Sequence, residues 1–273
     1  MFRGDLVKKT MIFIAFFIAI CVLTCVGVVN EKPIWACIGA ISSAILGYLI
    51  SIILTAIDAH EQGLLLWFQH IKFWNKDIRL SFSYLFRIQI NGKYLLVKGN
   101  RLKNQYQPIG GVYKYYDEAK PVLESFCYRP DVRMGNSNET DDLRIYIKGK
   151  HLLSYMQWFK LMKNREYDPL REFREELINS KLLPAEIFEN IEYRKVLVHN
   201  KGVQFSTYMQ CNELVYADVF EIKLSAKQKS AILNAVQEHS DMLCLATDNE
   251  LLSECYNGIE KNLGNNAKWL LGE

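Results

Sequence analysis

The hydropathy pattern divides the chain into an apolar N-terminal part and a mixed remainder. Two runs without charged residues, 10–29 and 34–57, are joined by a short polar stretch ending at Pro33. Each run can cross the ~30 Å hydrocarbon core of a bilayer as a helix, which takes about 20 apolar residues. We therefore expect a transmembrane helical hairpin over residues 10–57, behind a short N-terminal tail, 1–9.

The charges that flank the two runs predict which side the chain ends face. Arg3, Lys8 and Lys9 precede the first run, whereas the connecting stretch carries Lys32. Because cytoplasmic flanks hold the excess of Lys and Arg, both termini are expected in the cytoplasm, with the hairpin in the inner membrane. A cleavable signal peptide is the alternative for the first run, but its apolar region is usually shorter.

Small residues recur at every fourth position of the second run. This ridge consists of Gly39, Ser43, Gly47 and Ser51. Such ridges let helix backbones meet closely in lipid, where apolar burial gives no net driving force. The ridge predicts either self-association between copies or packing of the second helix on the first, and the sequence leaves both open.

The segment 58–75 joins the runs to the rest of the chain and is rich in aromatic residues. Trp67, Phe68, Phe73 and Trp74 stand here among polar side chains. Aromatic side chains favour the headgroup layer of a membrane. This juxtamembrane segment is expected either to continue the second helix or to lie in the interface as an amphipathic segment.

Beyond residue 75 the pattern changes to alternating and helical periods. The stretch 78–90 alternates as a strand does, Asn91-Gly92 is typical of a tight hairpin turn, and 93–98 returns as the partner strand. Further strands are expected at 143–147, 196–198, 203–209, 214–222 and 242–246, and helices at 151–162, 168–179, 225–239 and 247–263. The last two helices are expected to begin with capping boxes, at Ser225 and at Thr247. Strands mixed with helices predict an α/β (α+β) sandwich over residues 76–273.

Composition narrows the function classes. The net charge of +3 is too small to argue for nucleic-acid binding by bulk electrostatics. The chain has seven cysteines and no CxxC pair, so neither a disulfide framework nor a zinc site is indicated. The histidines show no metal-ligand spacing.

The strongest chemical signal is the heptapeptide Arg171-Glu172-Phe173-Arg174-Glu175-Glu176-Leu177. Glu172, Glu175 and Glu176 stand at i, i+3 and i+4 of a predicted helix, so their carboxylates share a face. Clustered hard oxygen ligands suit Mg²⁺ or Mn²⁺ carrying substrate phosphates, which makes these glutamates candidate metal ligands. The alternative is a solvated charged face in which Arg171 pairs with Glu175 one turn on.

The heptapeptide resembles the second half of a Nudix box, a pattern tied to nucleotide pyrophosphates and divalent metals. Counting back from Arg171, Gln157 and Lys163 stand where the box has Gly and Glu, and Ile178 stands where it has a later Gly. The Gly-Gly pair, Gly110-Gly111, lies far upstream. These departures imply a broken hydrolytic loop, so ligand binding is favoured over hydrolysis and no catalytic residue is assigned.

The order of these features is similar to the SMODS-associated Nudix domains of two-helix membrane effectors in CBASS antiphage systems. The phrase Gln107-Pro108-Ile109-Gly110-Gly111 and the heptapeptide, both behind the hairpin, carry the likeness. In that group a partner synthase makes a cyclic nucleotide on infection, the Nudix-like domain binds it, and the membrane helices disrupt the inner membrane.

The resemblance implies a cyclic di- or trinucleotide ligand, self-association on ligand binding and contact with the lipid bilayer. The ligand-binding residues that it implies are Gly110, Gly111, Arg171, Glu172, Glu175 and Glu176.

Three functions are left open. A ligand-gated membrane effector accounts for the hairpin, the small-residue ridge and the broken box. A membrane-anchored Nudix hydrolase of a nucleoside diphosphate derivative, with Mg²⁺ or Mn²⁺ as cofactor, accounts best for the three glutamates. A scaffold that holds a partner at the membrane is the third.

Overall fold

The computed structural model describes residues 61–99, 105–133 and 141–272. Contacts divide the chain into two units, Met1–Leu64 and Leu65–Glu273. The described elements belong to the second unit, apart from the first turn of helix α3 (Glu61–Lys72).

Several sequence predictions concern the part of the chain outside the described residues. They are the transmembrane runs 10–29 and 34–57 and the ridge Gly39, Ser43, Gly47 and Ser51. Of the helices that the structure does describe, none is both long and apolar enough to span a bilayer.

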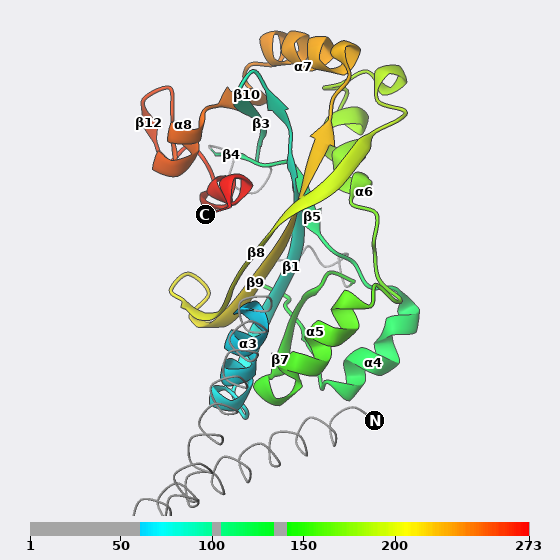
Figure 1. Cartoon of the computed structure of the whole chain (residues 1–273), viewed down its shortest axis with the longest axis vertical. Helices are drawn as coiled ribbons and strands as arrows, with labels where there is room; N and C mark the ends of the chain where they lie inside the picture. The colour runs from blue at the N-terminus through cyan, green and yellow to red at the C-terminus, as the bar shows by residue number, and fades with distance from the viewer. Residues whose placement is uncertain (1–60, 100–104, 134–140, 273) are drawn as a thin grey trace, which may run out of the picture. The chain divides into compact units, whose positions relative to one another are not determined.

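In the described part of the chain, a six-stranded sheet forms the centre of the domain (Figure 1). Its long strand β1 (Asp77–Arg87) lies between β9 (Cys211–Lys223), which runs parallel to it, and β7 (Arg144–Lys148), which runs antiparallel. Strand β8 (Glu192–Ser206) pairs with β9 at one edge, and β6 (Arg129–Pro130) pairs with β7 at the other.

The short strand β5 (Gly110–Val112) extends the same edge of β1 that β7 occupies. β7 pairs with Asp77–Ser81, and β5 pairs with Ser83–Leu85. Both strands therefore pair with the same edge of β1. The Gly-Gly strand β5 and the strand β7, which begins at Arg144, follow one another along that edge.

The β8–β9 hairpin corrects two predicted boundaries. The strands expected at 196–198 and 203–209 are wrong as separate elements, because both fall within the single strand β8 or the turn after it. The register of β8 shifts between Asn200 and Val203, where Gly202 takes a φ of +73°. A bulge of this kind accommodates polar residues and glycine inside a continuous strand. In the sequence the same residues are typical of a loop between two strands, which explains the wrong prediction.

A smaller sheet contains β2 (Gln89–Ile90), β3 (Lys93–Lys98), β4 (Tyr106–Gln107) and β10 (Leu243–Ala246). The predicted turn between β2 and β3 is confirmed, with φ of +50° at Asn91 and +75° at Gly92. Both values are positive, as the hairpin turn requires.

One face of β1 packs on helices α5 (Leu152–Lys160) and α6 (Leu170–Phe173). The ring of Phe82 lies 4.5 Å from that of Phe159, and the ring of Phe86 lies 5.8 Å from that of Phe173. The even-numbered aromatic residues of β1 therefore build the main core, as strand alternation requires. Helix α6 continues as the π-helical turn η3 (Arg174–Asn179), which confirms the predicted end of this helix.

Two predicted capping boxes are confirmed. Ser225 begins α7 (Ala226–Glu238), and Thr247 begins α8 (Asp248–Ser253), each by accepting a hydrogen bond from the third residue of its helix. The prediction that helix α8 extends to residue 263 is wrong.

Helix α8 ends early because Glu254, directly after it, takes a left-handed φ of +55°. The chain then turns at Asn257-Gly258, where φ is +51° and +76°. This turn joins β11 (Cys255–Tyr256) to β12 (Ile259–Glu260). The remaining elements are η1 (Asp117–Ala119), α4 (Lys120–Ser125), η2 (Gly149–His151), η4 (Ala185–Ile187) and η5 (Asn265–Leu271).

Candidate functional site

A cavity of about 950 Å³ opens on the odd-numbered face of β1. Ser81 and Ser83 line it, whereas their neighbours Phe82 and Tyr84 point into the core on the other side. Further along the strand, Leu85 packs into a second apolar cluster. The hollow exists because β1 carries small hydroxyl side chains where a fully packed sheet face would carry large apolar ones.

The walls of the cavity come from both sheets, from the C-terminal turn η5, and from α6 with its continuation η3, which together form the glutamate helix. Besides Ser81 and Ser83, the lining comprises Leu85, Val97, Lys98, Gln107, Pro108, Gly110, Gly111, Val112, Lys114, Arg133, Asp142, Arg144, Arg171, Glu172, Glu175, Glu176, Ser180, Leu182, Val215, Met242, Asn266 and Trp269. All six residues that the sequence assigns to ligand binding are in this set. Their placement at one cavity agrees with that assignment, and their binding of a ligand stays a prediction.

The two glycines of β5 are required by close packing. A Cβ on Gly110 would collide with the carbonyl oxygen of Tyr84, and one on Gly111 would collide with the side chain of Glu172. The glutamate helix can therefore cross β5 closely because no side chain intervenes.

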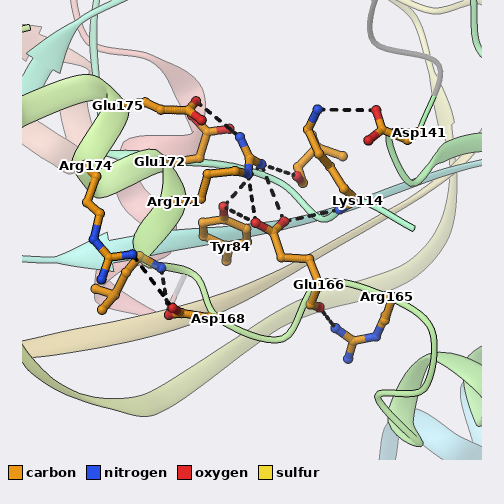
Figure 2. Close-up of polar contacts among 12 residues, drawn as sticks. Tyr84, Lys114, Asp141, Arg165, Glu166, Asp168, Arg171, Glu172, Arg174 and Glu175 are labelled. Carbon is orange, nitrogen blue, oxygen red and sulfur yellow. Dashed lines mark hydrogen bonds and ion pairs between the residues drawn. The ribbon is translucent and has the colours of Figure 1, made fainter. Parts of the chain in front are cut away.

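Arg171 is the centre of the charged network in this wall. Figure 2 shows its guanidinium between Glu166 on one side and Glu172 and Glu175 on the other. Its nitrogens lie 2.8 Å from Glu166, 2.7 Å from Glu172 and 3.2 Å from Glu175. A further hydrogen bond of 3.2 Å reaches the carbonyl of Val112 at the end of β5.

These contacts shift the pKa values of the network. Burial by itself would lower the pKa of Arg171, but hydrogen bonding to Glu166 and the charge of Glu172 hold it above its ordinary value. Burial raises the pKa of Glu172, against the opposing charge of Arg171. The guanidinium is therefore a permanent cation, and it compensates carboxylates that would otherwise repel one another.

Glu176 differs from its two neighbours because its nearest polar partner is a backbone group. Its Oε2 accepts a hydrogen bond of 3.2 Å from the N–H of Gly110. Burial raises the pKa of Glu176 to about 8, and the hydrogen bond from Gly110 opposes that rise. This carboxyl is therefore a much weaker acid than an ordinary glutamate.

The predicted metal ligands do not converge on one point. Glu172 and Glu175 turn toward Arg171, and Glu176 turns toward Gly110. Within residues 61–99, 105–133 and 141–272, no group of three or more His, Cys, Asp or Glu side chains is arranged to hold a metal ion. In this arrangement the carboxylates do not fit a divalent cation, and Mg²⁺ or Mn²⁺ binding stays a prediction.

Glu166 is a member of this network that sequence reasoning missed. It is buried, and its second oxygen also accepts a hydrogen bond of 3.2 Å from the N–H of Lys114. Counting by the fixed spacing of the Nudix box led to Lys163. A search for any acidic residue shortly before Arg171 would have found Glu166.

Three basic side chains that line the cavity, Lys114, Arg133 and Arg144, were missed as well. Each of them is paired with an aspartate. The pairs are Lys114 with Asp141 at 3.2 Å, Arg133 with Asp131 at 3.2 Å and Arg144 with Asp142 at 3.0 Å. The alternation of Arg144, Tyr146 and Lys148 in a short strand was the available signal, since it marks a polar sheet face.

Trp269 of η5 supplies an aromatic surface to the same cavity. Its indole stacks on the imidazole of His199 with ring centres 4.1 Å apart and an angle of 13° between the planes. The tryptophan is therefore held in place by strand β8, which carries His199.

The fold and the site define a class of protein. A mixed α/β domain brings an Arg-Glu helix across a Gly-Gly strand at the edge of a polar cavity, which agrees with the Nudix resemblance of the sequence. Residues 77–271 match the SMODS-associated NUDIX domain, and the chain belongs to this family. No curated protein matches the chain.

Proposed function

We propose that this protein is a membrane-anchored CBASS antiphage effector whose Nudix-like domain binds a cyclic di- or trinucleotide made by a partner synthase. The observation that carries the proposal is the cavity of about 950 Å³. Its volume lies at the upper end of the range for small-molecule sites, so it suits a ligand larger than a mononucleotide. Membership of the SMODS-associated family supports the same context.

The charge distribution of the cavity favours one orientation of such a ligand. Phosphates carry negative charge, and the wall with Glu172 and Glu175 would repel them. The same lining offers Arg133 and Arg144, whose forked donors match phosphate oxygens. We infer that the phosphodiester groups lie against these two arginines and the bases toward Trp269, because every base can stack on an aromatic ring.

The membrane part of the proposal rests on the sequence. Both termini and the Nudix-like domain face the cytoplasm, and ligand binding brings several hairpins together until they disrupt the inner membrane. The ridge Gly39, Ser43, Gly47 and Ser51 is the proposed contact between copies. Replacing Gly47 by Leu keeps the span apolar, and it should prevent depolarisation of cells that express an active synthase while ligand affinity is unchanged.

Calorimetry of the purified protein against a panel of cyclic di- and trinucleotides tests the sensor function. One member should bind at micromolar concentration or better. Arg144→Gln should weaken that binding by about tenfold, because one charge-assisted contact to phosphate is lost. Arg194→Gln is the matched control, since Arg194 is exposed and pairs with Glu221 outside the cavity. If no member of the panel binds, the sensor function is wrong.

A hydrolase is the second candidate, favoured by the presence of Glu172, Glu175 and Glu176 in the cavity lining. Phosphate release from nucleoside diphosphate derivatives, measured with Mg²⁺ and with Mn²⁺, separates the two functions. We expect weak or absent turnover. Robust turnover that is lost in Glu175→Gln and in Glu176→Gln would favour the hydrolase.

A further inference from the structure

Helix α3 carries two opposite stripes, one packed on the domain and one exposed. Leu66, and Phe73 directly after the helix, are buried. Phe68 and Ile71 lie on the other side of the helix and are 58% and 51% exposed, and Leu65, between the two sides, is 42% exposed. A helix that merely covered the domain would present polar residues on its outer side, so this apolar stripe indicates a partner.

Gln69 fixes α3 to strand β8. Its side-chain carbonyl accepts a hydrogen bond of 2.7 Å from the N–H of Val203, and its amide donates one of 3.2 Å to the carbonyl of the same residue. Leu65 lies so close to Gly202 that a Cβ there would collide with it. These contacts hold the helix firmly against the β8–β9 hairpin.

The tip of the β8–β9 hairpin lies at the same end of the domain as α3 (Figure 1). Phe205 is 61% exposed and Tyr208 is 82% exposed. Phe205 lies near the end of β8 and Tyr208 in the turn that follows it. The apolar stripe of the helix and the aromatic tip of the hairpin are therefore at the same end of the domain.

Three lysines near this surface, Lys72, Lys76 and Lys201, are exposed. The ammonium groups of Lys72 and Lys76 lie 5.3 Å and 5.8 Å from the ring of Phe73. The acidic residue Asp77 at the start of β1 is paired with Arg129 at 2.9 Å. An anionic partner is therefore favoured at this end.

We propose that Leu65, Phe68, Ile71, Phe205 and Tyr208 form a bilayer-contacting surface that lies in the headgroup layer of an anionic membrane. The proposal rests on the membrane anchoring proposed above. Aromatic and aliphatic side chains bordered by lysines are the composition of membrane-interface segments.

The length of the connecting chain favours a bilayer as the partner. The uncharged run ends at Ile57, four peptide units before α3 begins at Glu61. Four residues reach at most about 14 Å, which is shorter than the ~18 Å length of a twelve-residue helix. With the second run in the membrane, α3 therefore begins near the headgroups.

Quenching by brominated lipid tests the contact in the full-length protein. The protein is reconstituted into phosphatidylcholine–phosphatidylglycerol vesicles whose acyl chains carry bromine near the headgroup. Tyr208→Trp adds a fluorophore at the hairpin tip, and Ile259→Trp adds one at β12, where the side chain is also exposed, at 61%. The parent spectrum is subtracted from each. The added fluorescence should be lost at residue 208 and retained at residue 259.

The outcomes separate this surface from the membrane anchoring on which it rests. Protein that does not float with the vesicles overturns both. Protein that floats, but with equal quenching at residues 208 and 259, overturns the surface and leaves the anchoring intact. Shielding at residue 208 that grows with the protein-to-lipid ratio, without quenching, would assign the surface to contact between copies and overturn the bilayer as its partner.

Discussion

Arg171 binds both carboxylate oxygens of Glu166: Nε lies 2.8 Å from one oxygen, and Nη2 lies 3.4 Å from the other. Glu166 precedes the glutamate helix and also accepts the N–H of Lys114, so the pair joins the helix to the chain that follows β5. This pair keeps the helix against the Gly-Gly strand and thereby sets the position of Glu172 in the cavity wall.

Loss of the Glu166 charge should destabilise the domain. Glu166→Gln is expected to lower the free energy of unfolding by about 2–4 kcal/mol. The reason is that the charged hydrogen bonds between Arg171 and Glu166 lose their negative partner. Urea unfolding of the purified protein measures the change. Glu175→Gln is the control, since that side chain is 50% exposed and should change stability by less than about 1 kcal/mol. Equal losses in the two variants would contradict the central role of the Glu166 pair.

Stability should fall as pH rises through the neutral range. Burial raises the pKa of Glu176 to about 8, whereas an unfolded chain releases this proton at about pH 4. Between these values the folded protein binds more protons than the unfolded one, so the free energy of unfolding decreases with pH and levels off above the folded pKa.

Glu176→Gln should flatten this dependence. The amide is neutral throughout, so the variant should gain stability relative to the parent as pH increases. Calorimetric melting temperatures between about pH 5 and about pH 9 test the slope. Glu175→Gln should keep most of the parental slope, because Glu175 is half exposed. A parental slope in Glu176→Gln would show that other groups are responsible.

The packing of Gly111 on Glu172 should appear as a coupling free energy. Gly111→Ala introduces a Cβ that collides with the Glu172 side chain, and Glu172→Ala removes the obstacle. The double variant should be more stable than the sum of the single effects, by on the order of 1 kcal/mol. Gly92→Ala, at a turn with open space around it, should combine with Glu172→Ala additively.

The attachment of α3 to β8 should depend on Gln69. Gln69→Ala removes both hydrogen bonds to Val203, and exchange of the Val203 amide hydrogen should become about tenfold faster, as expected for one lost hydrogen bond. Hydrogen exchange of the full-length protein is the measurement. Gln204→Ala changes an exposed neighbour and should leave the rate unchanged. Unaltered protection in Gln69→Ala would show that apolar packing holds the helix.

Local signals predicted the elements whose backbone groups are satisfied within a few residues. The turn at Asn91-Gly92 and the capping boxes at Ser225 and Thr247 formed as expected, because each depends on residues adjacent in sequence. The extension of α8 failed for a local reason that was overlooked, since Asn257-Gly258 is the same kind of turn signal.

Fixed spacing was a poor guide to the charged network. It led to Lys163, whereas the carboxylate beside Arg171 belongs to Glu166. An irregular segment between α5 and α6 can change length without moving either helix, so distance in sequence does not determine which side chain meets Arg171.

The sequence by itself determined the family, the two uncharged runs and the Arg-Glu helix with its Gly-Gly partner, because these depend on residue type and order. Tertiary structure decided what the site consists of. Pairing of β7 and β5 along one edge of β1 placed Arg144 and Lys114 in the same cavity lining as the glutamates. Burial against Gly110 made Glu176 a weak acid, since desolvation depends on what surrounds a carboxyl and not on its neighbours in the chain.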